Sequence, residues 1–150
     1  MSTFVRKVRL RFPAHRERLA RARDLVRAAL AADPSGAFTG EDMDEILLGL
    51  QESLSNASRH NPDPLVELSF WIRAGRFHAC LRGRGPAFDP DQVRPPDEDH
   101  PAEHGYGLLL LKRTMDRVRY RRVGSWNLLR LVRAGSNRDE TVKFDRGGAR

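Results

Sequence analysis

Three polar residues, Glu52, Asn56 and His60, stand four residues apart in a segment with helical periodicity. On an α-helix this spacing stacks them along roughly 12 Å of one ridge. An amide oxygen suits Mg²⁺, which binds one or two protein oxygens together with phosphates. A carboxylate one turn away can take a proton from an attacking hydroxyl group. The same spacing also occurs on the polar face of an ordinary amphipathic helix, so the three residues alone do not establish a site.

One glycine-containing segment further along the chain could accept phosphates. Residues 105–107 (Gly-Tyr-Gly) lead into an apolar run that begins at Leu108. Glycines let a ligand approach the backbone closely, and the helix that follows offers unpaired N–H groups and a positive dipole end to an anion. Taken by itself, Gly-Tyr-Gly fits a loop hinge equally well.

The elements that must position these residues are predicted from periodicity and turn signals. Thr39 and Asp42 have the spacing of a capping box, which predicts the start of the helix that carries Glu52. The other predicted elements follow from apolar spacing: a strand with Phe4, Val8, Leu10 and Phe12 on one face, a helix from Pro13 to a turn at 33–36, the helix from about 39 to 60, an antiparallel hairpin over 66–81 that turns at Ala74-Gly75, a helix from 108 to about 116, and strands at 118–120 and 128–132.

These elements predict an α+β fold. The economical packing is a two-layer sandwich in which three helices cover one face of a mixed, mostly antiparallel sheet. We expect one domain over residues 1–134, with a mobile proline-rich loop at 88–104, and a polar, frayed tail over 135–150.

Composition narrows the partners and the compartment. The net charge of +7 favours acidic partners, but the arginines are spread along the chain and base-stacking aromatic residues do not interleave with them. We therefore do not expect direct nucleic-acid binding. A single cysteine, Cys80, excludes an internal disulfide. Neither a secretory signal nor an apolar segment long enough to span a membrane is present, so we expect a cytoplasmic protein without membrane contact.

Three segments together carry a resemblance to a known family. Residues 52–60 (ESLSNASRH) resemble the N box of the GHKL ATPase superfamily, in the form used by anti-sigma-factor serine kinases. Residues 81–90 (LRGRGPAFDP) resemble its G1 box, and residues 105–108 (GYGL) resemble its G2 box. The boxes occur in the family's order with a proline-rich lid between the last two, and the resemblance covers about residues 4–133. It implies the histidine-kinase-like, Bergerat-type ATP-binding fold.

The resemblance also implies roles for individual residues. Glu52 matches the catalytic base and Asn56 matches the ligand of Mg²⁺, while His60 closes the N box. Gly85 matches a retained glycine of the G1 box. Gly105 and Gly107 match the glycines whose backbone lies against the phosphates of ATP, and Leu108 completes that box.

The G1 box departs from the family's pattern at the end that reads adenine. Gly83 stands where the family has an aspartate that accepts the adenine amino group, and Ala87 replaces a glycine. Losing a hydrogen bond to a charged acceptor costs roughly 1.5–3 kcal/mol, or about ten- to more than a hundredfold in affinity.

Two functions therefore follow from the resemblance. The first is a serine/threonine kinase that binds a sigma factor and phosphorylates a STAS-type antagonist with ATP and Mg²⁺, as a homodimer. The alternative is a non-catalytic regulator of the same fold that binds protein partners and has weak or lost nucleotide binding. Intact Glu52 and Asn56 favour the first, and Gly83 favours the second.

Overall fold

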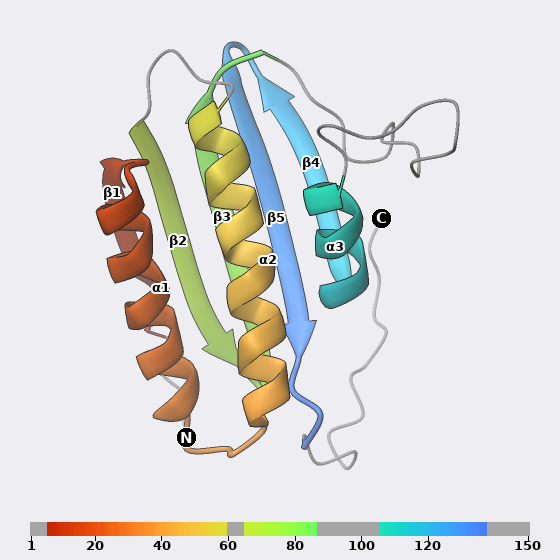
Figure 1. The fold of residues 1–150 in the computed structure, drawn as a ribbon. Coiled ribbons are helices and arrows are strands. Elements are labelled where there is room, and N and C mark those ends of the chain that lie inside the picture. The colour runs from red at the N-terminus through yellow and green to blue at the C-terminus, as the bar shows by residue number, and fades with distance from the viewer. Residues whose placement is uncertain (1–5, 60–64, 87–105, 138–150) are drawn as a thin grey trace.

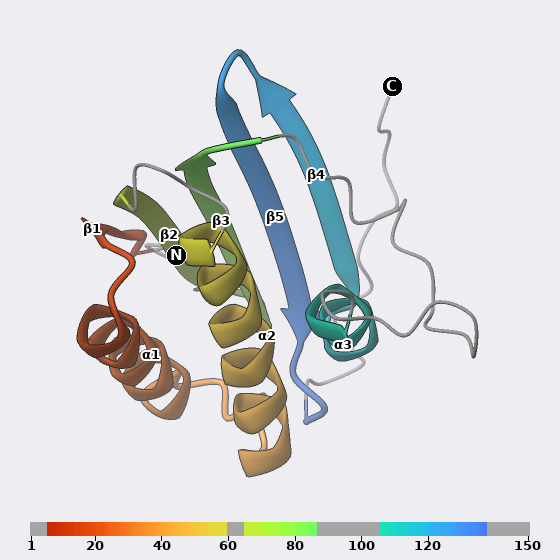
Figure 2. The ribbon, with the colours of Figure 1, turned by 45° about the horizontal axis from the view of Figure 1, so that its top comes forward.

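A computed structural model describes residues 6–59, 65–86 and 106–137. In these residues the elements run in the order β1 (Val8–Pro13), α1 (Arg16–Ala31), α2 (Gly40–Arg59), β2 (Leu65–Arg73), β3 (Arg76–Arg84), α3 (Tyr106–Thr114), β4 (Arg117–Val123) and β5 (Trp126–Ala134). The strands form one sheet in the order β1-β2-β3-β5-β4, and the helices lie on one of its faces (Figure 1). Turning the molecule shows the two layers (Figure 2). The predicted α+β two-layer fold is confirmed.

The sheet differs from the prediction in one respect, because every strand pair in the described residues is antiparallel rather than mixed. Two of the connections are tight hairpins. Ala74 and Gly75, both with positive φ, turn β2 into β3 as predicted, and Gly124 with positive φ turns β4 into β5. Positive φ at such turns matches the right-handed twist of the flanking strands. The β1–β2 and β3–β5 pairs, whose strands are connected through helices, are antiparallel as well.

The core lies between the sheet and the helices. Alternate residues of β2, β3 and β5 face it, and α2 supplies the apolar stripe predicted from its spacing. Its fully buried side chains include Ile46, Leu50 and Leu54 of α2, and Val66, Leu68, Phe77 and Leu131 of the sheet. Among the described residues, no helix combines the length and apolarity needed to cross a membrane.

Two predicted helices had wrong boundaries. Pro13 does not begin the first helix; it ends β1, where it pairs with Leu65, and α1 begins at Arg16. An edge strand tolerates a proline because the missing N–H can face solvent. The third helix begins two residues earlier than predicted and ends at Thr114, because Asp116 joins the sheet edge, donating its backbone N–H to the carbonyl of Val132.

Gly49 sets how closely α2 and α3 approach. A Cβ at this position would lie 2.7 Å from Cε of Met115, 3.0 Å from Oγ1 of Thr114 and 3.2 Å from Cδ1 of Leu111. The bare backbone of α2 therefore lies against the end of α3.

We expect Gly49→Val to lower the free energy of unfolding by about 1–3 kcal/mol, because the added methyl groups overpack the contact with α3. Gly49→Ala should be nearly neutral, since the better helix propensity of alanine, worth about 1 kcal/mol, offsets a smaller clash. Urea unfolding measures both. Gly40→Val, at a position on the same helix with open space around it, is the control. Equal stability of the two valine variants would contradict this packing.

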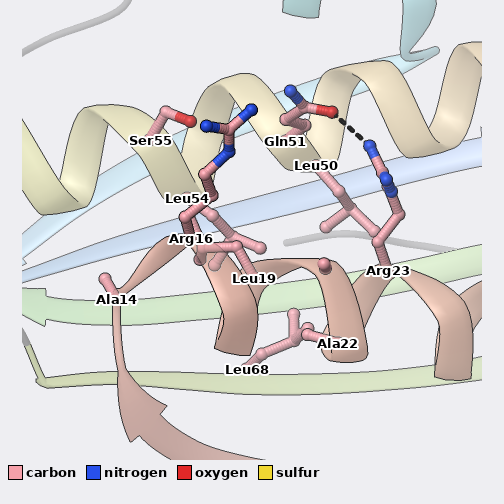
Figure 3. Close-up of a pocket in the computed structure, with 11 residues that line it drawn as sticks. Ala14, Arg16, Leu19, Ala22, Arg23, Leu50, Gln51, Leu54, Ser55 and Leu68 are labelled. Carbon is pink, nitrogen blue, oxygen red and sulfur yellow. Dashed lines mark hydrogen bonds between the residues drawn. The ribbon is translucent and has the colours of Figure 1, made fainter.

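A hollow of about 440 Å³ separates the N-terminal part of α1 from α2 (Figure 3). Arg23 closes one side by donating from Nη1 to Oε1 of Gln51 at 2.6 Å, and Leu50, Leu54 and Leu68 line the inner wall. None of the site residues predicted from the sequence lines this hollow.

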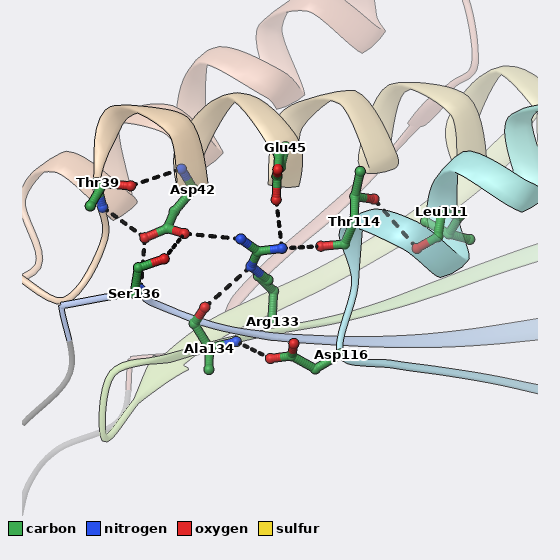
Figure 4. A network of polar contacts seen from close by, with 9 residues as sticks. All are labelled: Thr39, Asp42, Glu45, Leu111, Thr114, Asp116, Arg133, Ala134 and Ser136. Carbon is green, nitrogen blue, oxygen red and sulfur yellow. Dashed lines mark hydrogen bonds and ion pairs between the residues drawn. The ribbon is translucent and has the colours of Figure 1, made fainter. Parts of the chain in front are cut away.

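A buried carboxylate ties the start of α2 to the end of β5 (Figure 4). Asp42 is 1% exposed, and its two oxygens accept hydrogen bonds from the backbone of Thr39, from Nη2 of Arg133 at 3.0 Å and from both the N–H and the hydroxyl of Ser136. In return, the N–H of Asp42 donates to Oγ1 of Thr39 at 3.1 Å. The predicted capping box is confirmed.

The same network reaches the segment that was expected to be a frayed tail. The N–H of Gly135 donates to the carbonyl of Gly75 and the N–H of Asn137 donates to the carbonyl of Ala37, so residues 135–137 are held against the body of the fold. Residues 138–150 and the predicted lid at 88–104 lie outside the described residues. The domain boundary at residue 134 stays a prediction.

Candidate functional site

The C-terminal half of α2, the end of β3 and the start of β5 meet at one pocket. In the register of the sheet, Gly83 stands between Val66 on β2 and Asn127 on β5. The described residues that line the pocket are Ser53, Asn56 and Ala57 of α2, Val66 of β2, residues 81–86, and Asn127 and Leu129 of β5. The N-box helix and the G1 strand, predicted separately from the sequence, therefore share one site.

The predicted catalytic residues lie at this end of α2. Asn56 lines the pocket and is half-buried, and Glu52 lies one helical turn earlier, also half-buried. Between them, Ser53 is buried and donates from its hydroxyl to the carbonyl of Gly49 at 2.8 Å. His60 lies outside the described residues.

The predicted phosphate-binding segment leads into α3. Gly107 and Leu108 belong to the first turn of this helix, and Gly105 lies outside the described residues. The helix runs antiparallel to α2 (Figure 1), and its last turn meets Gly49, so its N-terminus points toward the level of Asn56. Free N–H groups and the positive dipole end at that terminus suit an anion.

Sequence reasoning missed a polar cluster at the mouth of the pocket. Oδ1 of Asn127 accepts hydrogen bonds from the hydroxyl of Tyr120 at 2.6 Å and from Nη1 of Arg122 at 3.0 Å, and Nδ2 of Asn127 donates to the carbonyl of Pro86 at 3.0 Å. Arg122 also donates to the carbonyl of Gly85 at 2.8 Å. The cluster fixes the G1 segment against β5. An available signal was the polar Asn127 at an inward-facing position of an apolar strand.

The two ends of the pocket fit a nucleotide unequally. At the metal end, the amide oxygen of Asn56 is the hard ligand that Mg²⁺ accepts alongside phosphates. At the base end, Gly83 offers no side-chain acceptor. Asn127 and Pro86, bonded to each other, occupy this end. The residues therefore fit Mg²⁺ at Asn56, whereas at Gly83 they lack an acceptor for the adenine amino group.

Comparison with known proteins identifies the family. The sequence matches the histidine kinase-like ATPase domain over residues 12–133, which is most of the chain. The chain belongs to the histidine kinase-like ATPase family. The superfamily predicted from the three boxes is confirmed, and an ATPase domain of this family implies ATP binding, typically with Mg²⁺. No curated protein matches this ATPase-family chain by sequence.

Solved structures share the fold of this ATPase-family chain. The RsbU and RsbW domains of Rv1364c from Mycobacterium tuberculosis give a TM-score of 0.63 at 15% identity, over 86% of this chain and 32% of that chain. The SiaB-SiaC complex from Pseudomonas aeruginosa gives 0.61 at 11% identity, over 83% of this chain and 88% of that chain. This chain thus spans about a third of the mycobacterial chain, and at these identities the likeness shows the fold alone.

Proposed function

We propose that this chain is an anti-sigma-factor-like protein kinase that transfers the γ-phosphoryl group of ATP to a serine or threonine of a STAS-type antagonist. One observation carries the proposal: α2 brings Asn56 into the pocket that also contains Gly83 and Gly85, with Glu52 one turn away. The similarity of fold to structures that contain an RsbW domain and SiaB supports the same class of regulator. A sigma factor as second partner and a homodimer belong to this proposal.

In this proposal the residues at the pocket have separate roles, set by their positions on α2 and α3. Asn56 would hold Mg²⁺, and the N-terminus of α3 would face the phosphates. Glu52 is half-exposed, so its carboxylate is accessible to a hydroxyl brought by a protein substrate, whose proton it would accept. When bound, ATP would supply the phosphoryl group, and Mg²⁺ would neutralise negative charge on its phosphates.

The experiment that tests the proposal is transfer of radiolabelled phosphate from ATP to a STAS-domain protein encoded next to this chain. Label on a serine or threonine of that protein, lost when the Mg²⁺ ligand is removed by Asn56→Ala, is the expected result. Absence of any transfer across candidate antagonists would contradict the kinase proposal.

A second expectation concerns the base end. Gly83 lies in β3 without positive φ, so an aspartate can adopt its backbone conformation. We expect Gly83→Asp to tighten Mg²⁺–ATP binding by about ten- to a hundredfold, because it restores a charged acceptor for the adenine amino group. Isothermal titration of both proteins measures this. Gly40→Asp, with the same charge at the other end of α2, is the control and should bind as the wild type does.

The alternative function is a non-catalytic regulator that keeps the fold for protein binding. Gly83 favours it, because this residue offers adenine no side-chain acceptor. It predicts that the wild type binds no nucleotide at millimolar ATP whereas Gly83→Asp does. That pair of results would replace the kinase proposal with the scaffold.

A further inference from the structure

The face of the sheet opposite the helices is strongly basic. None of the described helices covers it (Figure 2). Its two edges present Arg9 and Arg11 of β1 and Arg117, Arg119 and Arg121 of β4, all exposed. Arginines from β2, β3 and β5 lie between them. In the described strands the one acid on this face is Glu67, which already pairs with Arg11 at 3.7 Å and Arg82 at 3.4 Å. We call this surface the open sheet face.

Two of these charges oppose one another directly. Arg119 on β4 stands opposite Arg130 on β5. Like charges at directly opposed positions destabilise a sheet. Folding by itself does not favour such a pair, whereas a polyanion lying on the face would neutralise both members. Its presence points to an anionic partner.

Aromatic rings lie among these charges. The ring of Trp71 stacks on that of His78 with centroids 5.1 Å apart and planes 1° apart, and Nζ of Lys7 lies 4.9 Å from the Trp71 centroid. The guanidinium groups of Arg82 and Arg84 on β3 lie 4.9 and 4.8 Å from the ring of Trp126 on β5. These are the chain's two tryptophans, and both stand on the open sheet face.

The pKa of His78 is lowered by its surroundings on this face. Burial, followed by the positive charges of Arg130, Arg76 and Arg73, lowers the pKa of His78. The ring therefore stays neutral near pH 7 and remains a flat stacking partner for Trp71. Two rows of the sheet separate the two tryptophans, one with Ser69, Cys80 and Arg130 and the next with Glu67, Arg82 and Leu128.

We propose that the open sheet face binds single-stranded nucleic acid, with phosphates at the arginine-rich edges and bases against Trp71 and Trp126. Four strand spacings of about 4.8 Å make the face about 19 Å wide between β1 and β4, which is enough for a strand and its splayed bases. Stacking on aromatic residues combined with a basic surface is the chemistry that single-strand binders use. Self-association of two copies of this chain through the open sheet face would bring arginines against arginines. A second copy therefore does not fit as the partner on this face.

Binding is measured with the full chain and fluorescein-labelled 20-nucleotide oligo(dT) and oligo(U), by anisotropy and by quenching of tryptophan fluorescence. We expect quenching on binding, because both tryptophans report from this face. With about five phosphate contacts, the affinity should fall about a hundredfold between 50 and 200 mM salt. Comparison of the two oligomers separates DNA from RNA as the preferred strand.

Two variants and a matched control locate the surface. Arg119→Gln with Arg130→Gln should weaken binding and flatten the salt dependence by about two phosphate contacts, and it removes an opposed pair, so the fold should not suffer. Arg18→Gln with Arg21→Gln removes the same charge from exposed positions of α1 and should leave binding nearly unchanged. Trp71→Ala should weaken binding about five- to a hundredfold without changing the salt slope.

Four results would overturn the proposal. The first is an equal loss of oligonucleotide affinity in the α1 double variant and in the sheet double variant. That result would mean that the oligonucleotide is attracted to the net charge of the protein and not to one face. The second is polyglutamate or phosphatidylglycerol vesicles quenching and competing as well as the oligonucleotides, which would make an acidic protein or a membrane the partner. The third is unchanged oligonucleotide affinity in Trp71→Ala. The fourth is complete displacement of the oligonucleotide by Mg²⁺–ATP at matched ionic strength, which would place its binding in the nucleotide pocket. Oligonucleotide binding that persists in the presence of Mg²⁺–ATP would support the open sheet face.

Discussion

Replacing Asp42 with asparagine should lower the free energy of unfolding by roughly 3–5 kcal/mol, a large part of the 5–15 kcal/mol typical of a domain. The carboxylate accepts hydrogen bonds only, and its partners at Thr39, Arg133 and Ser136 all donate. An amide would turn an NH₂ group toward those donors and leave the partly buried guanidinium of Arg133 with Glu45, 2.6 Å away, as its remaining carboxylate partner in the network. Urea unfolding followed by tryptophan fluorescence measures the change.

The control for this substitution lies on the same helix. Asp44 pairs with Arg27 at 3.4 Å, but its side chain is 72% exposed, so Asp44→Asn should change stability by no more than about 0.5–1 kcal/mol. If the two asparagine variants lost stability equally, the buried network would not contribute what its geometry implies.

The network also predicts that the free energy of unfolding decreases at acid pH. Burial by itself would raise the pKa of Asp42, but hydrogen bonds from Ser136, Thr39 and Arg133 outweigh it and hold that pKa well below its usual range. A carboxyl whose pKa is depressed by folding contributes stability that is fully present above its unfolded pKa, about 3.9, and is lost as pH falls toward the folded value. The wild type should therefore lose stability below about pH 4 more steeply than Asp42→Asn does.

Replacing Glu52 with glutamine should lower the rate of phosphoryl transfer by about 10²–10⁴-fold, the usual contribution of a positioned general base. Glu52 is half-exposed on α2, so the isosteric amide should leave the fold intact. Mg²⁺–ATP affinity should change little, because Asn56 and the N-terminus of α3 supply that binding in the proposed site. Initial rates with radiolabelled ATP, at saturating antagonist, give the comparison.

Glu41→Gln is the matched control for this prediction, because it removes an exposed carboxylate from the first turn of the same helix, far from the pocket. It should transfer phosphate at nearly the wild-type rate. A Glu52→Gln variant that keeps its rate within about threefold would show that the proton leaves by another route. Because the roles of Glu52 and Asn56 were inferred from the sequence, they stay predictions until these rates are known.

The sequence by itself determined the elements and the family. Local rules set the helices and hairpins: the Thr39–Asp42 capping box, the apolar stripe of α2 and the turn at Ala74 and Gly75 all depend on residues a few positions apart. An edge effect caused its error at the start of the first helix. Pro13 belongs to β1 because that strand lies at the border of the sheet, and position in a sheet is not visible in local spacing.

Only the tertiary structure decided which distant residues meet. Asp42 accepts a hydrogen bond from Ser136, 94 positions away in the sequence, and Asn127 donates one to the carbonyl of Pro86 at the pocket. Along the chain, arginines and aromatic residues do not interleave, so the sequence argued against nucleic-acid binding. The folded sheet places Trp71 beside Lys7 and Trp126 beside arginines of β3, and the proposed nucleic-acid surface rests on that arrangement. Periodicity determines which face of a strand a residue occupies, but its neighbours there are set by long-range register.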